Sequence, residues 1–367
     1  MTGIGRAEFI SGGLAAAVFA RSAFADNSDR EPVRAVLLHL GHNMWCEWLP
    51  ESIAVQLKEV EYKRPDLKLV TDELLWRKVT DHASAKGMNT VVIDIGEALV
   101  YPSHPELGVE GSWSPEKLCA ELKRLRGLGL EPIPKLNFSA THDAWLKDYH
   151  RMLTLPKWYE VAKDVINDVI DIFGKPRLFH LGWDEEYVGY AKGRRYFVMR
   201  SDEMWWHDFL YTVKCVEDRG VRPWVWSDYG WKHPEYFTRC PKSVVQSNWY
   251  YDEVLGGFDL KDYRADHHRY RLEEFYKLEE SGFDQIPCGT NWVGDYRKRD
   301  GFGADDVIGK LVKLGREVIS KDHRLGFMMA PWQQCDTSEH ADFCNRGIDL
   351  FADALEGRIH PMNRVRM

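Results

Sequence analysis

Short apolar runs alternate along this chain with longer stretches in which apolar residues recur every three or four positions. The runs are typical of buried strands and the stretches of amphipathic helices. The predicted strands are 35–41, 90–96, 131–138, 177–183, 222–228, 243–249, 284–291 and 325–331. The predicted helices are 72–86, 114–128, 157–173, 202–219, 263–281, 304–320 and 339–355. Several helices end beside a glycine that can serve as a C-cap, namely Gly87, Gly129, Gly220 and Gly282.

Strands that alternate with helices in this way predict an α/β fold, and eight of them predict a (β/α)8 TIM barrel in a single domain. Only the connection 229–242 is too short for a full helix. An open, doubly wound sheet would favour a glycine-rich phosphate turn after the first strand, and the sequence has none there. We therefore assign residues 26–367 to one barrel.

The first 25 residues have the pattern of an export signal. Arg6 precedes an apolar stretch at 14–20, and Ala23-Phe24-Ala25 forms an A-x-A cleavage site before Asp26. The apolar stretch is too short to cross a bilayer, and no later segment is a transmembrane candidate. We expect cleavage near Ala25 and a periplasmic or secreted protein.

Composition excludes some classes of partner. The chain of 367 residues is 44% hydrophobic and 29% charged, with a formal net charge of −8, which argues against nucleic acid as a partner. Its 7 cysteines show neither C-x-x-C nor zinc spacing, although Cys335 and Cys344 could form a disulfide outside the cytoplasm. We expect no cofactor and no bound metal, and the sequence leaves the oligomeric state open.

A barrel of this kind carries its chemistry where the strands end, because the loops that follow all strands converge there. Polar and aromatic residues gather at those ends in this chain. In strand order they are His39 and His42; Asp94 and Glu97; Asn137 and His142; Asp184, Glu185 and Glu186; Trp226 and Asp228; Trp249, Tyr250 and Tyr251; Asn291 and Trp292; Trp332 and Gln333.

The fourth strand is the most informative, because an apolar run at 178–183 opens directly into Asp184, Glu185 and Glu186. Most isolated acidic clusters are solvated turns. At a strand end in a barrel, however, close carboxylates are suited to acid and base catalysis. With a period of two, His180 shares the inward face with Asp184, either as a core histidine or as part of the site.

Other candidates also have a structural alternative. His39 and His42 are spaced so that a strand does not place both rings on one face, so we do not expect a metal there. Lys135 suits the role of a barrel-layer or ion-pair residue better than that of a Schiff-base lysine. Some of the 15 tryptophans must be core, but tryptophans at four strand ends suit the apolar faces of a pyranose sugar.

The fourth strand resembles a known signature. His180-Leu181-Gly182-Trp183-Asp184-Glu185 resembles the H-x-G-G-D-E motif of family 20 glycoside hydrolases, the β-N-acetylhexosaminidases and related β-N-acetylgalactosaminidases. Trp226-Ser227-Asp228 resembles the W-D-E run on that family's fifth strand, and Trp332 its late tryptophan.

The chain also departs from that family. Trp183 stands where the motif has its second glycine, and Glu186 adds a third acid. We also expect no separate domain before the barrel. His39 and His42 stand where a substrate-clamping arginine is expected. These differences bear on the sugar more than on the class of reaction.

The resemblance implies a carbohydrate substrate and retaining hydrolysis assisted by the substrate's own 2-acetamido group. Glu185 would be the general acid and base, Asp184 would orient the acetamido group, and Tyr250 or Tyr251 would complete its clamp. Adjacent strand residues face opposite ways, so Asp184 and Glu185 both enter the site only if the chain leaves regular β geometry. Otherwise Glu186, which shares the face of Asp184, is the acid.

Two other functions remain open from the sequence. The first is a two-carboxylate glycosidase acting on a non-acetamido sugar, with Asp228 or Glu97 as the partner of Glu185. The second is a sugar-binding barrel without catalysis.

Overall fold

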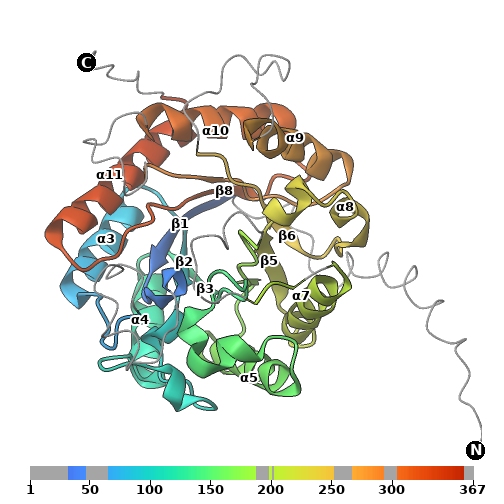
Figure 1. Cartoon of the computed structure of the whole chain (residues 1–367). Coiled ribbons are helices and arrows are strands. Elements are labelled where there is room, and N and C mark those ends of the chain that lie inside the picture. The colour runs from blue at the N-terminus through green and yellow to red at the C-terminus, as the bar shows by residue number, and fades with distance from the viewer. Residues whose placement is uncertain are drawn as a thin grey trace, which may run out of the picture.

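The computed structural model describes residues 32–46, 65–186, 198–200, 202–251, 267–292 and 304–358. These residues form a single 8-stranded sheet in the order β6-β5-β4-β3-β2-β1-β8-β7. All its strand pairs are parallel. The sheet curls into a barrel with helices around its outside (Figure 1). The predicted (β/α)8 TIM barrel is confirmed.

The eight strands all lie within or overlap the predicted runs. They are β1 (Val33–His39), β2 (Thr90–Asp94), β3 (Glu131–Lys135), β4 (Leu178–His180), β5 (Arg222–Trp226), β6 (Val245–Ser247), β7 (Cys288–Gly289) and β8 (Gly326–Met329). Single bridges between Gln246 and Gln285 and between Trp249 and Cys288 link β6 to β7. These bridges close the barrel.

The helices of the outer layer also follow the prediction. They are α3 (Glu73–Ala85), α4 (Pro115–Gly127), α5 (Pro156–Ile172), α7 (Asp202–Glu217), α9 (His267–Glu280), α10 (Ala304–Val318) and α11 (Ser338–Leu355). The connection between β5 and β6, predicted to be too short for a full helix, holds only the four-residue α8 (Tyr236–Arg239).

Short 3-10 helices follow several strands and shape the loops of the site. They are η1 (Asn43–Trp45), η3 (Gly96–Ala98), η4 (Pro105–Leu107), η5 (Ala144–Met152) and η6 (Asp228–Trp231).

Alternation along β1 shows how the sequence divides the core. Ala35 and Leu37 face the barrel interior, where they pack with Val92 and Ile133. Val36 and Leu38 face the helices and join the larger core between helices and barrel. This is the period of two expected for a strand buried on both faces.

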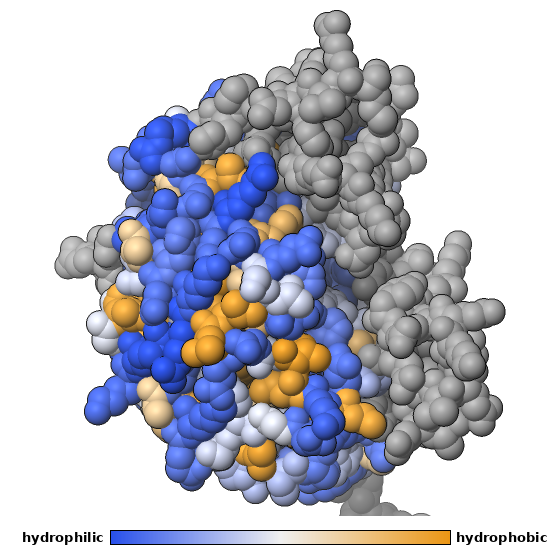
Figure 2. Space-filling model, turned by 90° about the vertical axis from the view of Figure 1, so that its left-hand side faces the viewer, coloured by the Kyte–Doolittle hydropathy of each residue, from blue (hydrophilic) through white to orange (hydrophobic). Residues whose placement is uncertain are grey.

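The outer helices are amphipathic. On α3, Trp76, Val79 and Ala83 are fully buried, whereas Leu74 is 77% exposed. Figure 2, which shows the face over α3 and α11, has apolar side chains broken up by hydrophilic ones. Burial of one helix face against the sheet therefore holds this layer in place.

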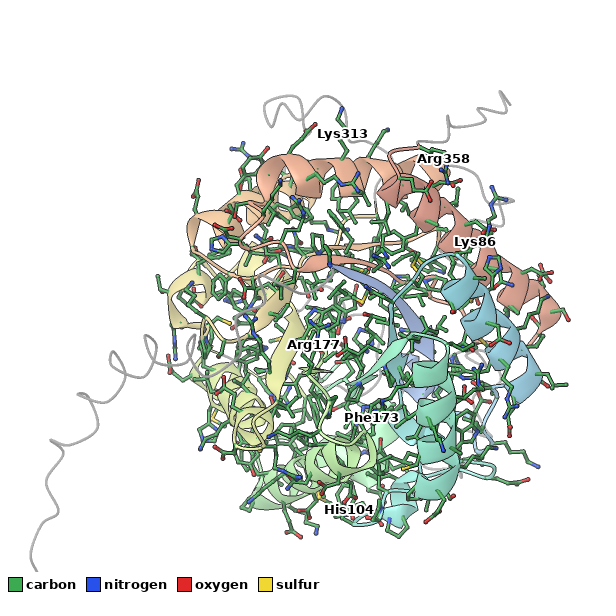
Figure 3. All side chains as sticks on the ribbon, turned by 180° about the vertical axis from the view of Figure 1, so that it is seen from behind. Lys86, His104, Phe173, Arg177, Lys313 and Arg358 are labelled. Carbon is green, nitrogen blue, oxygen red and sulfur yellow. The ribbon has the colours of Figure 1, made fainter. Side chains whose placement is uncertain are left out.

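The end of the barrel at which the strands begin carries ion pairs between neighbouring strands. Arg177, labelled near the barrel axis in Figure 3, pairs with Glu131 at the start of β3, with 2.6 Å between Nη2 and Oε2. Arg222 similarly pairs with Asp284 at 2.7 Å. In such barrels this face contributes stability rather than chemistry.

Several expectations fall outside the described residues or remain predictions. The export signal at 1–25 and its cleavage site precede the first described residue. Among the described residues, no helix combines the length and apolar character needed to cross a membrane. Cys335 and Cys344 are both buried and are present as free thiols.

Candidate active site

The chain leaves β geometry immediately after β4. Gly182, Trp183 and Glu185 all have positive φ angles, of 73°, 72° and 59°. A Cβ atom on Gly182 would lie 2.1 Å from Oδ1 of Asn137, so only glycine fits there. Asn137 Oδ1 accepts the backbone N–H of Trp183 at 3.2 Å. This turn is the departure from regular β geometry that Asp184 and Glu185 require to face the same side.

Asp184 and Glu185 meet at a buried histidine. Nε2 of His142 lies 3.1 Å from Oε2 of Glu185 and 3.5 Å from Oδ2 of Asp184. The two carboxylate side chains are 13% and 22% exposed, so both reach solvent. Nδ1 of His142 lies 3.3 Å from the carbonyl oxygen of Met44, which fixes the ring. The structure thus brings together three residues predicted from strands three and four.

Each carboxylate is oriented by a different neighbouring strand. Asn137, after β3, donates from Nδ2 to Oδ1 of Asp184 at 2.7 Å. Asp228, after β5, accepts the backbone N–H of Glu185 on Oδ2 at 2.8 Å. Burial and the nearby charge of Asp184 raise the pKa of Asp228 to about 8. The environment therefore favours the neutral form of Asp228, which still offers an acceptor to Glu185.

Two hydroxyl groups that the sequence analysis missed also hold this turn. Ser139 Oγ and Thr141 Oγ1 donate to the backbone oxygen of Asp184 at 2.5 and 3.1 Å. Both lie in the loop between Asn137 and His142. The sequence could have indicated them, because they lie in a loop that carries two predicted site residues.

Glu186 is separated from its two acidic neighbours. Its side chain is 1% exposed and pairs with Nη1 of Arg200 at 2.9 Å. The same guanidinium holds Asp208 on α7 through Nε at 2.7 Å. Burial raises the pKa of Glu186 although Arg200 opposes that shift. Glu186 was predicted as a substrate contact or as the alternative acid, and the structure instead places it in a buried ion-pair network.

Trp183 explains how the chain accommodates its departure from the family motif. Its indole is buried, donates to Thr212 of α7 at 3.1 Å, and lies 4.7 Å from the guanidinium of Arg200. The side chain thus fills space between the turn and α7. The left-handed φ angle of Trp183 is one that glycine adopts more easily, which is consistent with the glycine found there in the motif.

An aromatic cluster lies at the barrel mouth. We use this name for Trp45, Trp226, Tyr251 and Trp332 together with the His39 ring. Trp332 is central, with ring centroids 5.5 Å from His39, 5.8 Å from Trp226, 6.1 Å from Trp45 and 6.3 Å from Tyr251. Trp45 was not predicted, because it falls beyond the end of the first strand.

His180 lies beside this cluster and is fully buried. Its ring is 4.8 Å from Trp226 and 4.9 Å from Trp224, and Nδ1 accepts the N–H of Gly182 at 3.1 Å. Burial lowers its pKa well below the ordinary value, so the ring is neutral. Among the described residues Nε2 has no hydrogen-bond partner. His180 therefore supports the turn while leaving one polar atom unpaired.

Beneath the cluster, Lys135 and Asp94 form a buried ion pair, with His39 Nδ1 3.4 Å from Asp94. Burial alone would raise the pKa of Asp94, but Lys135 and His39 outweigh it and lower the pKa. Burial lowers the pKa of His39. The prediction that Lys135 is an ion-pair residue is confirmed, and Asp94 is fully buried below the mouth.

Two predicted substrate contacts, Tyr250 and Asn291, and the alternative partner acid Glu97 make structural contacts. Tyr250 is fully buried in a cluster with Leu272 and Phe275, outside the barrel, because adjacent strand residues face opposite sides. Asn291 donates to the carbonyl oxygen of Phe343 at 3.0 Å and so anchors α11. Glu97, buried, accepts the N–H groups of His42 and Asn43 at 2.6 and 3.1 Å, which caps η1.

Trp249 and Trp292 complete the predicted set. Trp249 is 7% exposed, and its ring stacks 4.9 Å from Tyr251, at the edge of the aromatic cluster. Trp292 is partly exposed and immediately precedes residues outside the description. The spacing of His39 and His42 gives them separate partners, since His42 contacts Gln334.

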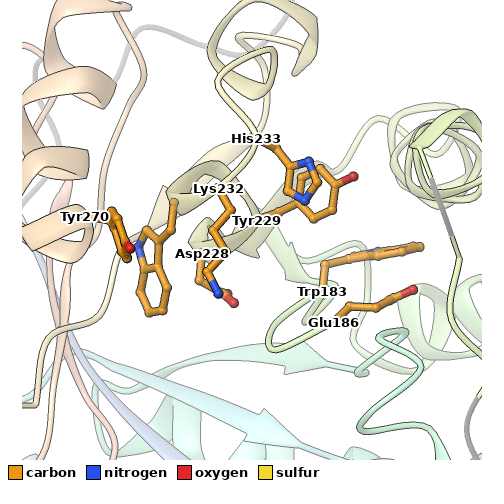
Figure 4. Close-up of a pocket in the computed structure, with 8 residues that line it drawn as sticks. Trp183, Glu186, Asp228, Tyr229, Lys232, His233 and Tyr270 are labelled. Carbon is orange, nitrogen blue, oxygen red and sulfur yellow. The ribbon is translucent and has the colours of Figure 1, made fainter. Parts of the chain in front are cut away.

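A pocket opens beside Asp228. Its walls come from Trp183, Glu186, Asp228, Tyr229, Trp231, Lys232, His233 and Tyr270. Figure 4 shows the stacked rings of Tyr229 and His233 above Asp228, which lies between Trp183 and Tyr270. Neither Asp184 nor Glu185 lines this pocket.

The His142, Asp184 and Glu185 group could also hold a cation. One ligand atom from each lies within 4.8 Å of the others. A divalent metal ion prefers such nitrogen and oxygen ligands. The same three residues suit proton transfer, so chelation is a useful test between the two chemistries.

Solved structures that share this fold include several family 20 β-N-acetylhexosaminidases. No protein-family model matches the chain, and no curated protein matches it. The identities to the solved structures are low, so these matches establish the shared barrel fold alone.

Among them is the exo-β-N-acetylglucosaminidase from Vibrio harveyi, with a TM-score of 0.57 and 13% identity over 89% of this chain. The β-N-acetylhexosaminidase from Streptomyces coelicolor A3(2) has a TM-score of 0.60 and 11% identity over 91% of this chain. That from Bacteroides fragilis has a TM-score of 0.58 and 15% identity over 92%. The chain spans 57%, 65% and 67% of these three chains, respectively.

Proposed function

We propose that this protein is a glycoside hydrolase that releases terminal β-linked N-acetylhexosamine, either GlcNAc or GalNAc, with retention of configuration. One observation carries the proposal: the left-handed turn after β4 presents Asp184 and Glu185 together at Nε2 of His142, at 3.5 and 3.1 Å. The fold shared with β-N-acetylhexosaminidases of known structure supports it.

Asp184 orients the 2-acetamido group of the substrate. Its Oδ1 is held by Asn137 at 2.7 Å, which leaves the other oxygen to accept the acetamido N–H. The acetamido carbonyl oxygen attacks the anomeric carbon as the glycosidic bond breaks, and an oxazolinium ring forms. The negative charge of Asp184 stabilises the positive charge on that ring.

Glu185 moves the proton. It donates to the glycosidic oxygen as the aglycone leaves, and then takes a proton from the water that attacks the anomeric carbon. The second attack opens the ring on the face that the aglycone left, so configuration is retained. His142 and Asp228 hold Glu185 by its side chain and its backbone, respectively.

The aromatic cluster provides the sugar contacts. Trp332, which is partly exposed, offers apolar ring surface for a pyranose, whereas the predicted contact Trp226 is buried and supports Trp332 from 5.8 Å away. Of the two tyrosines considered, only Tyr251 belongs to this cluster. Its hydroxyl, which contacts Cys288 Sγ at 3.9 Å, would turn to donate to the acetamido oxygen.

A two-carboxylate mechanism is the second candidate, because Asp228 lies beside Glu185. In that mechanism Asp184 would not act on an acetamido group, so Asp184→Asn would have little effect. A third candidate, a sugar-binding barrel, predicts affinity without turnover and unchanged affinity in Glu185→Gln.

The test is a panel of aryl β-glycosides against the wild type, Asp184→Asn, Glu185→Gln and the surface control Glu280→Gln. We expect release of the aryl group from GlcNAc or GalNAc glycosides, inhibition by an oxazoline mimic, and unchanged activity in the control, since Glu280 is exposed on α9. Both site variants should lose about 10²–10⁴-fold in kcat. Cleavage of only non-acetamido sugars would contradict the proposal.

We also propose that the protein is exported, on the basis of the signal-like pattern in residues 1–25. Mass measurement of the protein isolated from cell fractions tests this proposal. The expected mature chain begins at Asp26, whereas an uncleaved cytoplasmic chain would contradict it.

A further inference from the structure

Asp228 contacts the backbone of Glu185 rather than its carboxyl group. It follows β5, begins η6, and accepts the backbone N–H of Glu185 on Oδ2 at 2.8 Å. Asp228 is 6% exposed, so little water competes for this hydrogen bond. Oδ1 has no hydrogen-bond partner among the described residues.

Glu185, which donates this hydrogen bond, has a strained backbone conformation. Glu185 has a φ angle of 59°, in the left-handed region that costs free energy for a residue with a Cβ atom. Such a conformation persists only where its surroundings hold it. Trp183, in the same turn, is held by Asn137 from the loop after β3. The corresponding bond for Glu185 comes from Asp228.

We propose that Asp228 is the positioning residue of the general acid: its carboxyl group clamps the left-handed conformation of Glu185 and so delivers that side chain to His142 and Asp184. This inference rests on the proposed function. It gives the two halves of the site separate supports, since Asn137 holds Asp184 and Asp228 holds Glu185.

The charge around Asp228 favours a neutral clamp. The titratable groups that face it are Asp184 and Glu185 from the β4 turn and Glu274 from α9. Ionisation of Asp228 would add a negative charge beside these three carboxyl groups. A neutral acid accepts the N–H of Glu185 without that added charge, and an asparagine side chain, which has a carbonyl acceptor of similar shape, should do the same.

Leaving groups of different acidity provide the test. Departure of 2,4-dinitrophenol needs little protonation, whereas departure of a simple phenol depends on the general acid. In Asp228→Ala, kcat should fall about 10²-fold for the phenyl glycoside, since small misplacement of a catalytic group has such effects. The loss for the dinitrophenyl glycoside should be several-fold at most, and an oxazoline mimic should bind within a few-fold of the wild type.

Asp228→Asn is the matched variant and should keep both activities within a few-fold at pH 6. The inference is overturned if alanine leaves the phenyl glycoside activity intact, if both substrates lose equally, or if asparagine is as damaging as alanine. If the alanine variant does not fold, Asp228→Ser, whose hydroxyl is too short to reach Glu185, replaces it. An inactive wild type would instead contradict the proposed function, so the two failures are distinguishable.

Discussion

Gly182 is the position at which the backbone geometry of the site can be tested apart from its chemistry. Its φ angle is 73°, and an added Cβ would meet Oδ1 of Asn137 at 2.1 Å and Cα of Asn137 at 2.7 Å. The backbone atom cannot move aside without shifting β3. Asn137 would therefore be displaced from both Trp183 and Asp184, which it contacts at 3.2 and 2.7 Å.

The cost of Gly182→Ala follows from these contacts. The left-handed conformation costs an alanine about 1–2 kcal/mol. Loss of two buried hydrogen bonds, one of them to a carboxylate, adds roughly 2–4 kcal/mol. We expect a decrease in the free energy of unfolding of about 3–6 kcal/mol, measured by urea denaturation, and a kcat about 10²-fold lower because Asp184 loses its orientation.

Gly129 provides the control. Its φ angle is 77°, but nothing lies within 4 Å of its added Cβ. Gly129→Ala should therefore cost only the conformational term, about 1–2 kcal/mol, with activity retained. If Gly182→Ala were no more destabilising than Gly129→Ala, the close packing of the turn on Asn137 would be refuted.

Three further predictions concern charge. Arg200→Met leaves Glu186 and Asp208 buried without their partner, so the free energy of unfolding, measured by urea denaturation, should fall by about 3–5 kcal/mol. The control Arg239→Met breaks a surface ion pair with Glu203 and should lower it by at most about 1 kcal/mol. Equal decreases would contradict the buried network. The pKa of Asp228, raised to about 8 from an unfolded value near 4, means that its stabilising contribution is full below about pH 4 and is lost as pH rises to about 8. Between pH 5 and 8 the wild type should therefore lose more stability than Asp228→Asn, and parallel curves would contradict this. EDTA should leave glycosidase activity unchanged. If EDTA abolished the activity and a divalent ion restored it, His142, Asp184 and Glu185 would instead be metal ligands.

The fold was predictable because each strand and helix carries its own pattern. Alternation on β1 places Ala35 and Leu37 inside and Val36 and Leu38 outside. The predicted strands nevertheless extend too far at their carboxyl ends. The run 177–183, for example, forms a strand only over Leu178–His180. Local hydrophobicity does not record a turn that is imposed by Asn137 from another strand.

The site was predictable only in part. Asp184, Glu185 and His142 follow strands whose ends converge, so their meeting follows from the fold. Tyr250 and Tyr251 are adjacent aromatic residues, and only the pleat separates the core residue from the one in the aromatic cluster. Arg200 could not be assigned, because nothing in the sequence pairs it with Glu186 and Asp208.

The three consecutive acids after β4 acquire different environments from three different neighbours. Asn137 of the β3 loop orients Asp184, Asp228 of the β5 loop holds Glu185, and Arg200 draws Glu186 into the protein. The first two contacts require β4 to keep its register with both flanking strands, where His180 lies opposite Lys135 and Trp224. A shift by one residue would exchange the inward and outward faces. The position of Asp184 and Glu185 therefore depends on pairing across three strands. The β4 strand itself can be short because its neighbours, rather than its own length, determine the geometry of the turn.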